Sequence, residues 1–94
     1  MHATVRTYAG DGAGDLFDAL EQREPEVREL ISTVPGFVSY TAFRVGRGGT
    51  TVTVCEDRGG TDESTRRAAA WVAEHVPVAV EPPAIAEGDS VLRF

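Results

Sequence analysis

The sequence predicts a single α+β domain, residues 1–94, whose elements follow the order βαββαβ and whose four strands form one antiparallel sheet. A chain of 94 residues is long enough for one domain and too short for two. Apolar residues alternate with a period of two in the strand-like segments and recur at three- and four-residue steps in the helical ones.

The first strand and the first helix are separated by a glycine-rich loop. Residues 2–9 alternate and are rich in β-forming side chains, which predicts a strand. Apolar residues then follow a helical period, which predicts an amphipathic helix over residues 15–34 with Asp15 as its N-cap. Pro25 removes one backbone hydrogen bond and must kink this helix or split it. Because the apolar phase continues through Pro25, we expect a kink.

A β-hairpin follows the first helix. Residues 37–45 and 50–56 are rich in Val, Thr, Phe and Tyr, which favours strands. The segment 46–49 between them, Gly-Arg-Gly-Gly, is typical of a hairpin turn. The single cysteine, Cys55, lies in the apolar pattern of the return strand, and we interpret it as a small buried hydrophobic residue.

The last third of the chain predicts a helix and a final strand. Thr61 or Asp62 is the expected N-cap of a helix that runs to about His75, where a proline follows. The proline-rich segment 78–86 predicts an extended connection. Residues 90–94 alternate and predict the last strand.

One sheet face is left bare by this arrangement, which is that of the ferredoxin-like fold. Right-handed crossovers place both helices on the same face. The residues of the second strand that point away from the helices belong to one of two sets, depending on register: Tyr40 with Ala42, or Phe37 with Thr41 and Phe43. Both sets contain large apolar groups, and pairing two such faces would cover them. The pattern therefore predicts a homodimer.

The charge balance excludes several classes of partner. The chain has 15 acidic and 9 basic residues, a net charge of −6, and all the bases are arginine. Nucleic acids and anionic membrane surfaces both require a basic face, so neither is expected as a partner. No apolar run approaches the ~20 residues of a membrane span, and the N-terminus has no signal-peptide core, so we expect a cytoplasmic protein. Two distant histidines and one cysteine form no metal set, and no cofactor is expected.

Three segments resemble a known family. They are the run Val-Pro-Gly-Phe-Val-Ser-Tyr at 34–40, the strand Val-Thr-Val-Cys at 52–55, and the helix 63–71 that ends in Trp71. Together they resemble the antibiotic biosynthesis monooxygenase group of dimeric α+β barrel proteins. The resemblance implies a dimeric α+β barrel, and it implies relatives that include cofactor-independent oxygenases of polycyclic aromatic substrates and haem-degrading enzymes.

The haem-degrading branch fits this sequence poorly. That branch has an Asn in the first strand, and here the strand 2–9 has none. It also has an iron-ligating His about three turns after the Trp, whereas His75 follows Trp71 by one turn. Trp71 matches the second-helix Trp that lines the pocket of the oxygenases.

Two groups of residues are candidates for a site. Trp71 and His75 are four residues apart on one helical face, where they would form a pocket wall with His75 as acid or base. The alternative is that Trp71 is core and His75 caps the helix. Two Arg–Tyr pairs share a strand face and would hold an acidic or phenolic ligand: Arg6 with Tyr8, and Arg44 with Tyr40. The alternative is a paired or snorkelling arginine at the dimer rim.

Three functions remain open at this point. The first is a metal-free, monooxygenase-like enzyme acting on an aromatic or quinonoid molecule, in which His75 or an arginine assists deprotonation and Trp71 holds the ring. The second is a non-catalytic module that binds a hydrophobic aromatic small molecule in the same pocket. The third is an accessory dimer with no ligand. An enzyme requires a titratable group facing a cavity, a binding module requires only the cavity, and an accessory protein requires neither.

Overall fold

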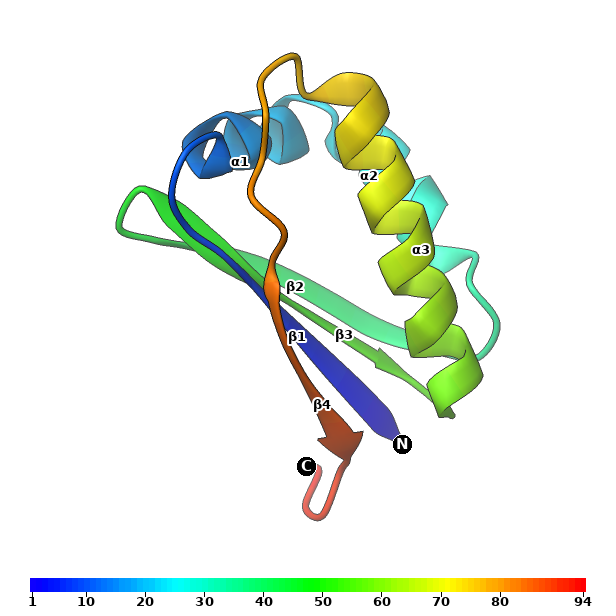
Figure 1. The fold of residues 1–94 in the computed structure, drawn as a ribbon. Helices are drawn as coiled ribbons and strands as arrows, with labels where there is room; N and C mark the ends of the chain where they lie inside the picture. The colour runs from blue at the N-terminus through cyan, green and yellow to red at the C-terminus, as the bar shows by residue number, and fades with distance from the viewer.

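A four-stranded antiparallel sheet with the strand order β2-β3-β1-β4 carries all the helices on one face (Figure 1). The computed structural model describes residues 1–94. Its elements are β1 (His2–Tyr8), α1 (Ala13–Gln22), α2 (Glu24–Ser32), β2 (Phe37–Val45), β3 (Gly48–Cys55), α3 (Arg58–His75) and β4 (Ala84–Asp89). This topology confirms the predicted ferredoxin-like arrangement, with β2 and β4 as the two edges.

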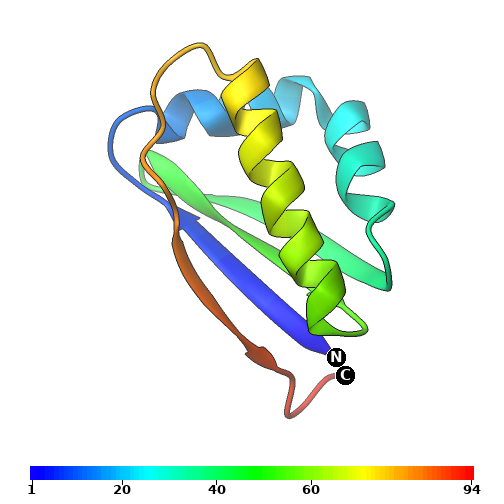
Figure 2. The same cartoon turned by 45° about the vertical axis from the view of Figure 1, so that its right-hand side comes forward.

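The first helical segment is split in two, so the expected kink is wrong. α1 and α2 run in different directions (Figure 2), and Arg23 between them leaves helical geometry at φ −114° and ψ 33°. Pro25 lies in the first turn of α2, where its missing N–H costs no helical hydrogen bond. The expected cap is also wrong: α1 begins at Ala13 after Gly12, and Asp15 lies inside its first turn.

The start of α3 differs from the expectation as well. Asp57 is its N-cap, and the carboxylate of Asp57 accepts a hydrogen bond of 3.0 Å from the N–H of Gly59. The expected caps, Thr61 and Asp62, therefore lie within the helix. Gly59 and Gly60 lie in the first turn of the helix, and a side chain on Gly60 would collide with Pro35 and Cys55. The helix ends at His75, as predicted.

The last strand is displaced from its predicted position. β4 is Ala84–Asp89, and it pairs with β1 from Thr7 opposite Ala84 to His2 opposite Asp89. Residues 90–94 extend past the first residue of β1, so they have no partner strand in this chain. Their apolar side chains are almost fully exposed: Val91, Leu92 and Phe94. The predicted strand 90–94 is therefore wrong for the single chain.

A bulge in β2 decides which residues face the helices. Phe37 pairs with Cys55 and Ser39 with Val54, so one extra residue of β2 interrupts the register. Phe37 and Tyr40 consequently both lie on the helix side, packed against the core. Thr41 and Phe43 face the opposite side, where Phe43 is 48% exposed.

The core lies between the helices and the inner face of the sheet. Its buried apolar cluster is Tyr8, Ala13, Leu16, Phe17, Val27, Ile31, Trp71 and Val76. Cys55 is also buried, as predicted, and burial raises the pKa of its thiol. No helix is long and apolar enough to cross a membrane.

Candidate functional site

Three cavities lie in a row between the helices and the sheet. The β2-side cavity, about 410 Å³, opens under α1 and α2 beside Phe37 and Ala42. The central cavity, about 20 Å³, lies among Arg6, Tyr40 and Trp71. The β4-side cavity, about 460 Å³, opens between α3 and β4. Only the two outer cavities fall in the size range of small-molecule sites.

Arg6 is the most unusual buried residue of this interior. Its side chain extends from β1 toward the helices and is only 1% exposed. The guanidinium donates to four hydroxyl oxygens, at distances of 3.3, 3.3, 2.9 and 2.9 Å: Thr51, Ser64, Thr65 and Thr53. These bonds engage four of its five N–H groups. The last N–H, on Nη2, has no partner among these hydroxyls.

The charge of Arg6 is not balanced by a carboxylate. All four hydroxyl partners are neutral, and every other arginine with a side-chain hydrogen bond bonds a carboxylate: Arg23, Arg28, Arg44, Arg66 and Arg67. A buried cation without an opposite charge is costly unless something compensates it. The pocket around Arg6 is therefore electrostatically suited to an anion.

Two tyrosines face the same centre. Tyr8 and Tyr40 both line the central cavity with Arg6. Burial raises the pKa of each phenol, and the charge of Arg6 offsets only part of that effect. Both tyrosines are thus neutral near pH 7, so neither is the missing counter-charge. They remain hydrogen-bond donors and acceptors for a bound molecule.

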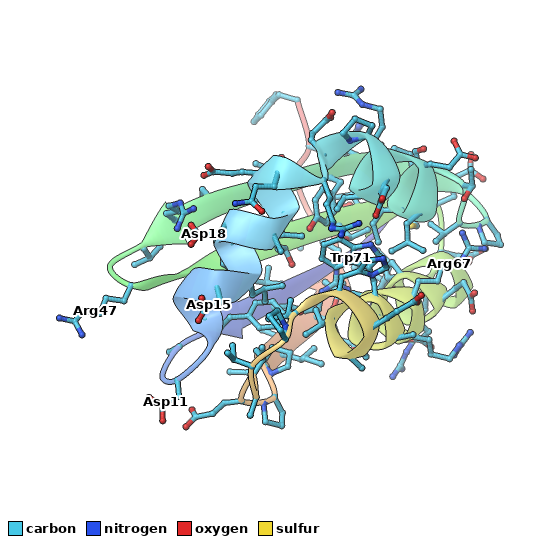
Figure 3. All side chains as sticks on the ribbon, turned by 90° about the horizontal axis from the view of Figure 1, so that it is seen from above. Asp11, Asp15, Asp18, Arg47, Arg67 and Trp71 are labelled. Carbon is cyan, nitrogen blue, oxygen red and sulfur yellow. The ribbon has the colours of Figure 1, made fainter.

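Trp71 closes the central cavity from the helix side. It is 6% exposed and points from α3 toward α2 (Figure 3). Its Nε1 is buried and has no hydrogen-bond partner. Buried indole N–H groups usually find an acceptor, so this one is available to an oxygen atom placed in the interior.

His75 lies at the helix end and lines none of these cavities. Its ring stacks on Trp71 with centroids 4.7 Å apart, and Nδ1 lies 3.1 Å from the Trp71 carbonyl oxygen. Nε2 faces Glu26 at 3.6 Å. This is the capping arrangement that the sequence left open as the alternative. A role for His75 as a base stays a prediction, because His75 lines neither of the cavities that Arg6 lines.

Arg44 is separated from the other candidates. It lies at the rim of the β2-side cavity, where its guanidinium binds Asp18 at 2.8 Å and Glu21 at 3.0 Å. These two carboxylates raise its pKa, Glu21 most. The structure thus brings Arg6, Tyr8, Tyr40 and Trp71 together, and leaves Arg44 and His75 outside.

A proline-rich segment, residues 76–83, forms one wall of the β4-side cavity, and we call it the strap (Figure 1). Arg6, Tyr8 and Thr65 lie in the wall of the same cavity, so Arg6 borders this cavity although its side chain is only 1% exposed. The strap rests on the loop before α1. Gly12, at φ +83°, is in such close contact with the backbone of Ala79 that a β-carbon there would overlap its carbonyl oxygen.

Sequence reasoning missed the hydroxyl ring and the strap. The signal for half the ring was present, because Thr51 and Thr53 alternate on one face of a strand, as Arg6 and Tyr8 do. Ser64 and Thr65 gave no such signal, since only the packing of α3 on β1 brings them to Arg6. Among residues 1–94, no three or more His, Cys, Asp or Glu side chains gather as a metal ion would require.

Comparisons with known proteins identify the fold. No protein-family model matches the chain, and no curated protein matches it in sequence. A protein of unknown function from Nitrosomonas europaea, NE2512, superposes with a TM-score of 0.69 at 20% identity, over 99% of this chain and 90% of that one.

Two oxygenases are also structurally similar. The ActVA-Orf6 monooxygenase of Streptomyces coelicolor, solved with the ligand nanaomycin D, has a TM-score of 0.63 at 22% identity, over 99% of this chain and 92% of that one. SnoaB of Streptomyces nogalater, a cofactor-independent oxygenase solved as a mutant, has a TM-score of 0.51 at 15% identity, over 99% and 93%. The chain therefore has the ferredoxin-like α+β fold of these three proteins along nearly its whole length.

Proposed function

We propose that this protein binds an acidic aromatic or quinonoid molecule, as its anion, in the β4-side cavity. The observation that carries the proposal is the buried guanidinium of Arg6, which has only neutral partners and borders this cavity. An ionised phenol, enol or hydroxyquinone would supply the missing negative charge. Its oxygen would accept the N–H of Nη2 that the hydroxyls leave free.

The walls of the cavity suit a flat ring system. A volume of about 460 Å³ lies within the range of small-molecule pockets. Apart from Arg6, Thr65 and Glu81, the walls are mainly aliphatic and proline side chains, among them Val72, Val76 and Ile85. Such walls favour rings over sugars or peptides. The free Nε1 of Trp71 lies in the adjoining central cavity and not in the wall of this one.

The similar structures support an oxygenase activity for the same site. One is a monooxygenase solved with nanaomycin D and another is described as a cofactor-independent oxygenase. In that reaction a ring CH₂ acidified by a conjugated ring carbonyl loses a proton to solvent, and Arg6 stabilises the resulting enolate. The carbanion adds O₂ and takes up a proton, and the hydroperoxide then loses water. Each O₂ consumed leaves one C=O on the ring and one H₂O.

A binding module without catalysis is the second candidate. His75 bonds the backbone of Trp71 and faces Glu26, and the raised pKa values of Tyr8 and Tyr40 make them poor proton donors and acceptors near pH 7. A substrate would therefore have to be acidic enough to ionise next to Arg6 without a dedicated base. A molecule that ionises but has no reactive CH₂ would simply remain bound.

The test is a pair of ligands of nearly equal shape. We compare a hydroxynaphthoquinone that is ionised at neutral pH with the parent naphthoquinone, which is neutral, and follow binding through Trp71 fluorescence and thermal shift. The wild type is expected to bind the anion at least about tenfold more tightly, equivalent to about 1.4 kcal/mol. Arg6→Met should abolish this preference, and Arg6→Lys should retain part of it because the charge remains.

Equal affinity for both ligands in the wild type would refute the anion site. Oxygen uptake then separates the two candidate functions. An anthrone-type substrate should give one quinone for each O₂ consumed if the protein is an oxygenase, and no uptake above the buffer rate if it is a binding module. Arg47→Met, a substitution in the β2–β3 turn remote from the cavity, is the matched control.

We also propose that two copies pair through the outer face of the sheet. The face opposite the helices carries small and apolar side chains: Ala3, Val5, Phe43, Val45, Val52, Val54, Ala84 and Ala86. Val45 is 58% exposed and all six residues of β4 are exposed in the single chain. Covering this face with a second copy would remove an exposed apolar surface from a small domain.

Sedimentation velocity tests the pairing. The wild type is expected to sediment as a dimer at micromolar concentration, and Phe43→Glu to shift it toward the monomer because it places a charge in the paired face. Ala70→Glu, on the exposed side of α3, adds the same charge elsewhere and should leave the dimer intact. A wild-type monomer would overturn the proposal.

A further inference from the structure

The three cavities share their walls, so together they form an interrupted passage from one edge of the sheet to the other. Leu20, Val27, Ile31 and Tyr40 line both the β2-side and the central cavity. On the other side of the central cavity the shared residues are Arg6, Tyr8 and Val72, which also line the β4-side cavity. The central cavity is thus a constriction between two open chambers.

The constriction selects by size and polarity. A volume of about 20 Å³ is close to the space that one water-sized molecule requires, so no aromatic ring fits through it without a large opening. The wall shared with the β2-side cavity consists of aliphatic side chains and one tyrosine ring. On that side a small apolar molecule meets mainly aliphatic surface, whereas the polar groups, Arg6 among them, line the other side of the constriction.

The β2-side cavity is unsuited to the anionic ligand. The two arginines at its rim already bind carboxylates: Arg44 binds Asp18 and Glu21, and Arg28 binds Glu24 at 2.6 Å. An aromatic anion would find no free cation there. It would also meet the negative charge of α1 and α2 at the rim.

We propose that the β2-side cavity is the entrance for dioxygen, which crosses the constriction to reach an anion held at Arg6. The use of this route by dioxygen as a substrate rests on the proposed oxygenase function. The arrangement of the three cavities does not depend on that function. An aromatic ligand in the β4-side cavity would fill that chamber, because bound ligands of this size bury most of their surface. The second substrate then needs another approach, and it would reach Arg6 from the β2 side when Leu20 and Tyr40, which pack against the core, move aside.

Trp71 reports the arrival of oxygen directly. It is the only tryptophan, it is buried, and it lines the constriction. Dioxygen quenches indole fluorescence on contact, so the lifetime-based quenching rate constant measures access to this point with no catalysis required. The experiment is run in an Ala69→Phe background, in which the added ring obstructs the β4-side cavity in place of a ligand.

Ala42→Phe is the decisive variant, because Ala42 lines the β2-side cavity and its enlarged side chain would obstruct the path through it. Ala69→Phe alone should leave Trp71 quenched by O₂ nearly as in the wild type. Adding Ala42→Phe should lower the rate constant severalfold. Adding Ala70→Phe, an equal ring on an exposed α3 residue that lines no cavity, should leave it unchanged.

The results separate the route from the function. Loss of quenching in Ala69→Phe alone would place the oxygen entrance on the β4 side and overturn the proposal. The proposal would also be overturned if, in the Ala69→Phe background, the Ala42→Phe variant were quenched as fast as the Ala70→Phe variant. If quenching behaves as expected but no ligand-dependent oxygen uptake occurs, the route stands and the oxygenase function falls. If uptake occurs, Ala42→Phe alone should raise the KM for O₂ and leave the Kd of the aromatic ligand unchanged.

Discussion

Replacing Thr53 by valine tests whether the hydroxyl ring holds Arg6. Thr53 is fully buried in β3, and its Oγ1 accepts a hydrogen bond of 2.9 Å from Nη2 of Arg6. Valine keeps the shape and suits a strand at least as well, so neither a cavity nor strand propensity explains a loss of stability. The change therefore removes one acceptor and leaves a buried, charged N–H without a partner.

The expected loss follows from that single bond. Hydrogen bonds to charged groups contribute about 1.5–3 kcal/mol, so Thr53→Val should lower the free energy of unfolding by about 2 kcal/mol. For a chain of this length that corresponds to a decrease in Tm of roughly 8–16 °C. Urea unfolding followed by Trp71 fluorescence gives the free energy, and calorimetry gives the Tm.

A matched control lies three residues earlier on the same strand. Thr50 is on the outer face. Its hydroxyl makes a long, exposed hydrogen bond of 3.5 Å with the hydroxyl of Thr7. Thr50→Val should change the free energy of unfolding by less than about 0.5 kcal/mol. If Thr53→Val is equally mild, the guanidinium is satisfied without this hydroxyl, and the account of Arg6 as a cation held by four specific acceptors is refuted.

Three further predictions concern other parts of the molecule. Asp89 and Glu87 raise the pKa of His2, so its contribution to stability is complete below its ordinary pKa of 6.5 and is lost as the pH rises through the raised value. The same bonds lower the pKa values of both acids, whose contributions are complete above their ordinary pKa values and are lost as the pH falls through the lowered ones. His2→Gln should therefore flatten the alkaline limb of a Tm–pH profile. Cys55, whose pKa is raised by burial, should react with a thiol reagent only at the rate of unfolding, which a urea series would show. Arg67 donates to the last turn of α2, so Arg67→Ala should cost about 0.5–1.5 kcal/mol in urea unfolding, and no loss would mean that this cap is unimportant.

Local periodicity predicted most of the fold. The β2–β3 hairpin and the end of α3 were predicted from alternation and from the proline after His75, both of which act within a few residues. The register of β2 was not predictable, because the bulge next to Phe37 depends on how the strand packs against α2 and β3. The position of β4 was missed for a similar reason: pairing with β1 selects residues 84–89 over a segment with stronger strand propensity.

The sequence predicted which residues line the candidate site, but it did not predict how they are arranged. Arg6, Tyr8, Tyr40 and Trp71 were named from strand alternation and family resemblance, and they do line one cavity. The sequence could not show that Arg6 is buried without a carboxylate, since its neutral partners come from β3 and α3, more than forty residues away. It also could not show that two carboxylates of α1 bind Arg44, because the break before Pro25 sets the direction of that helix.

The close contact of Gly12 with Ala79 has a consequence for how this site changes over evolutionary time. The strap lies against the loop before α1 only because Gly12 has no side chain, and a β-carbon there would displace the strap outward. Such a displacement widens the chamber beside Arg6 without altering any residue that touches a ligand. A single methyl group at position 12 thus offers a step by which descendants of this protein would come to accept larger ring systems, with the anion-binding chemistry kept intact.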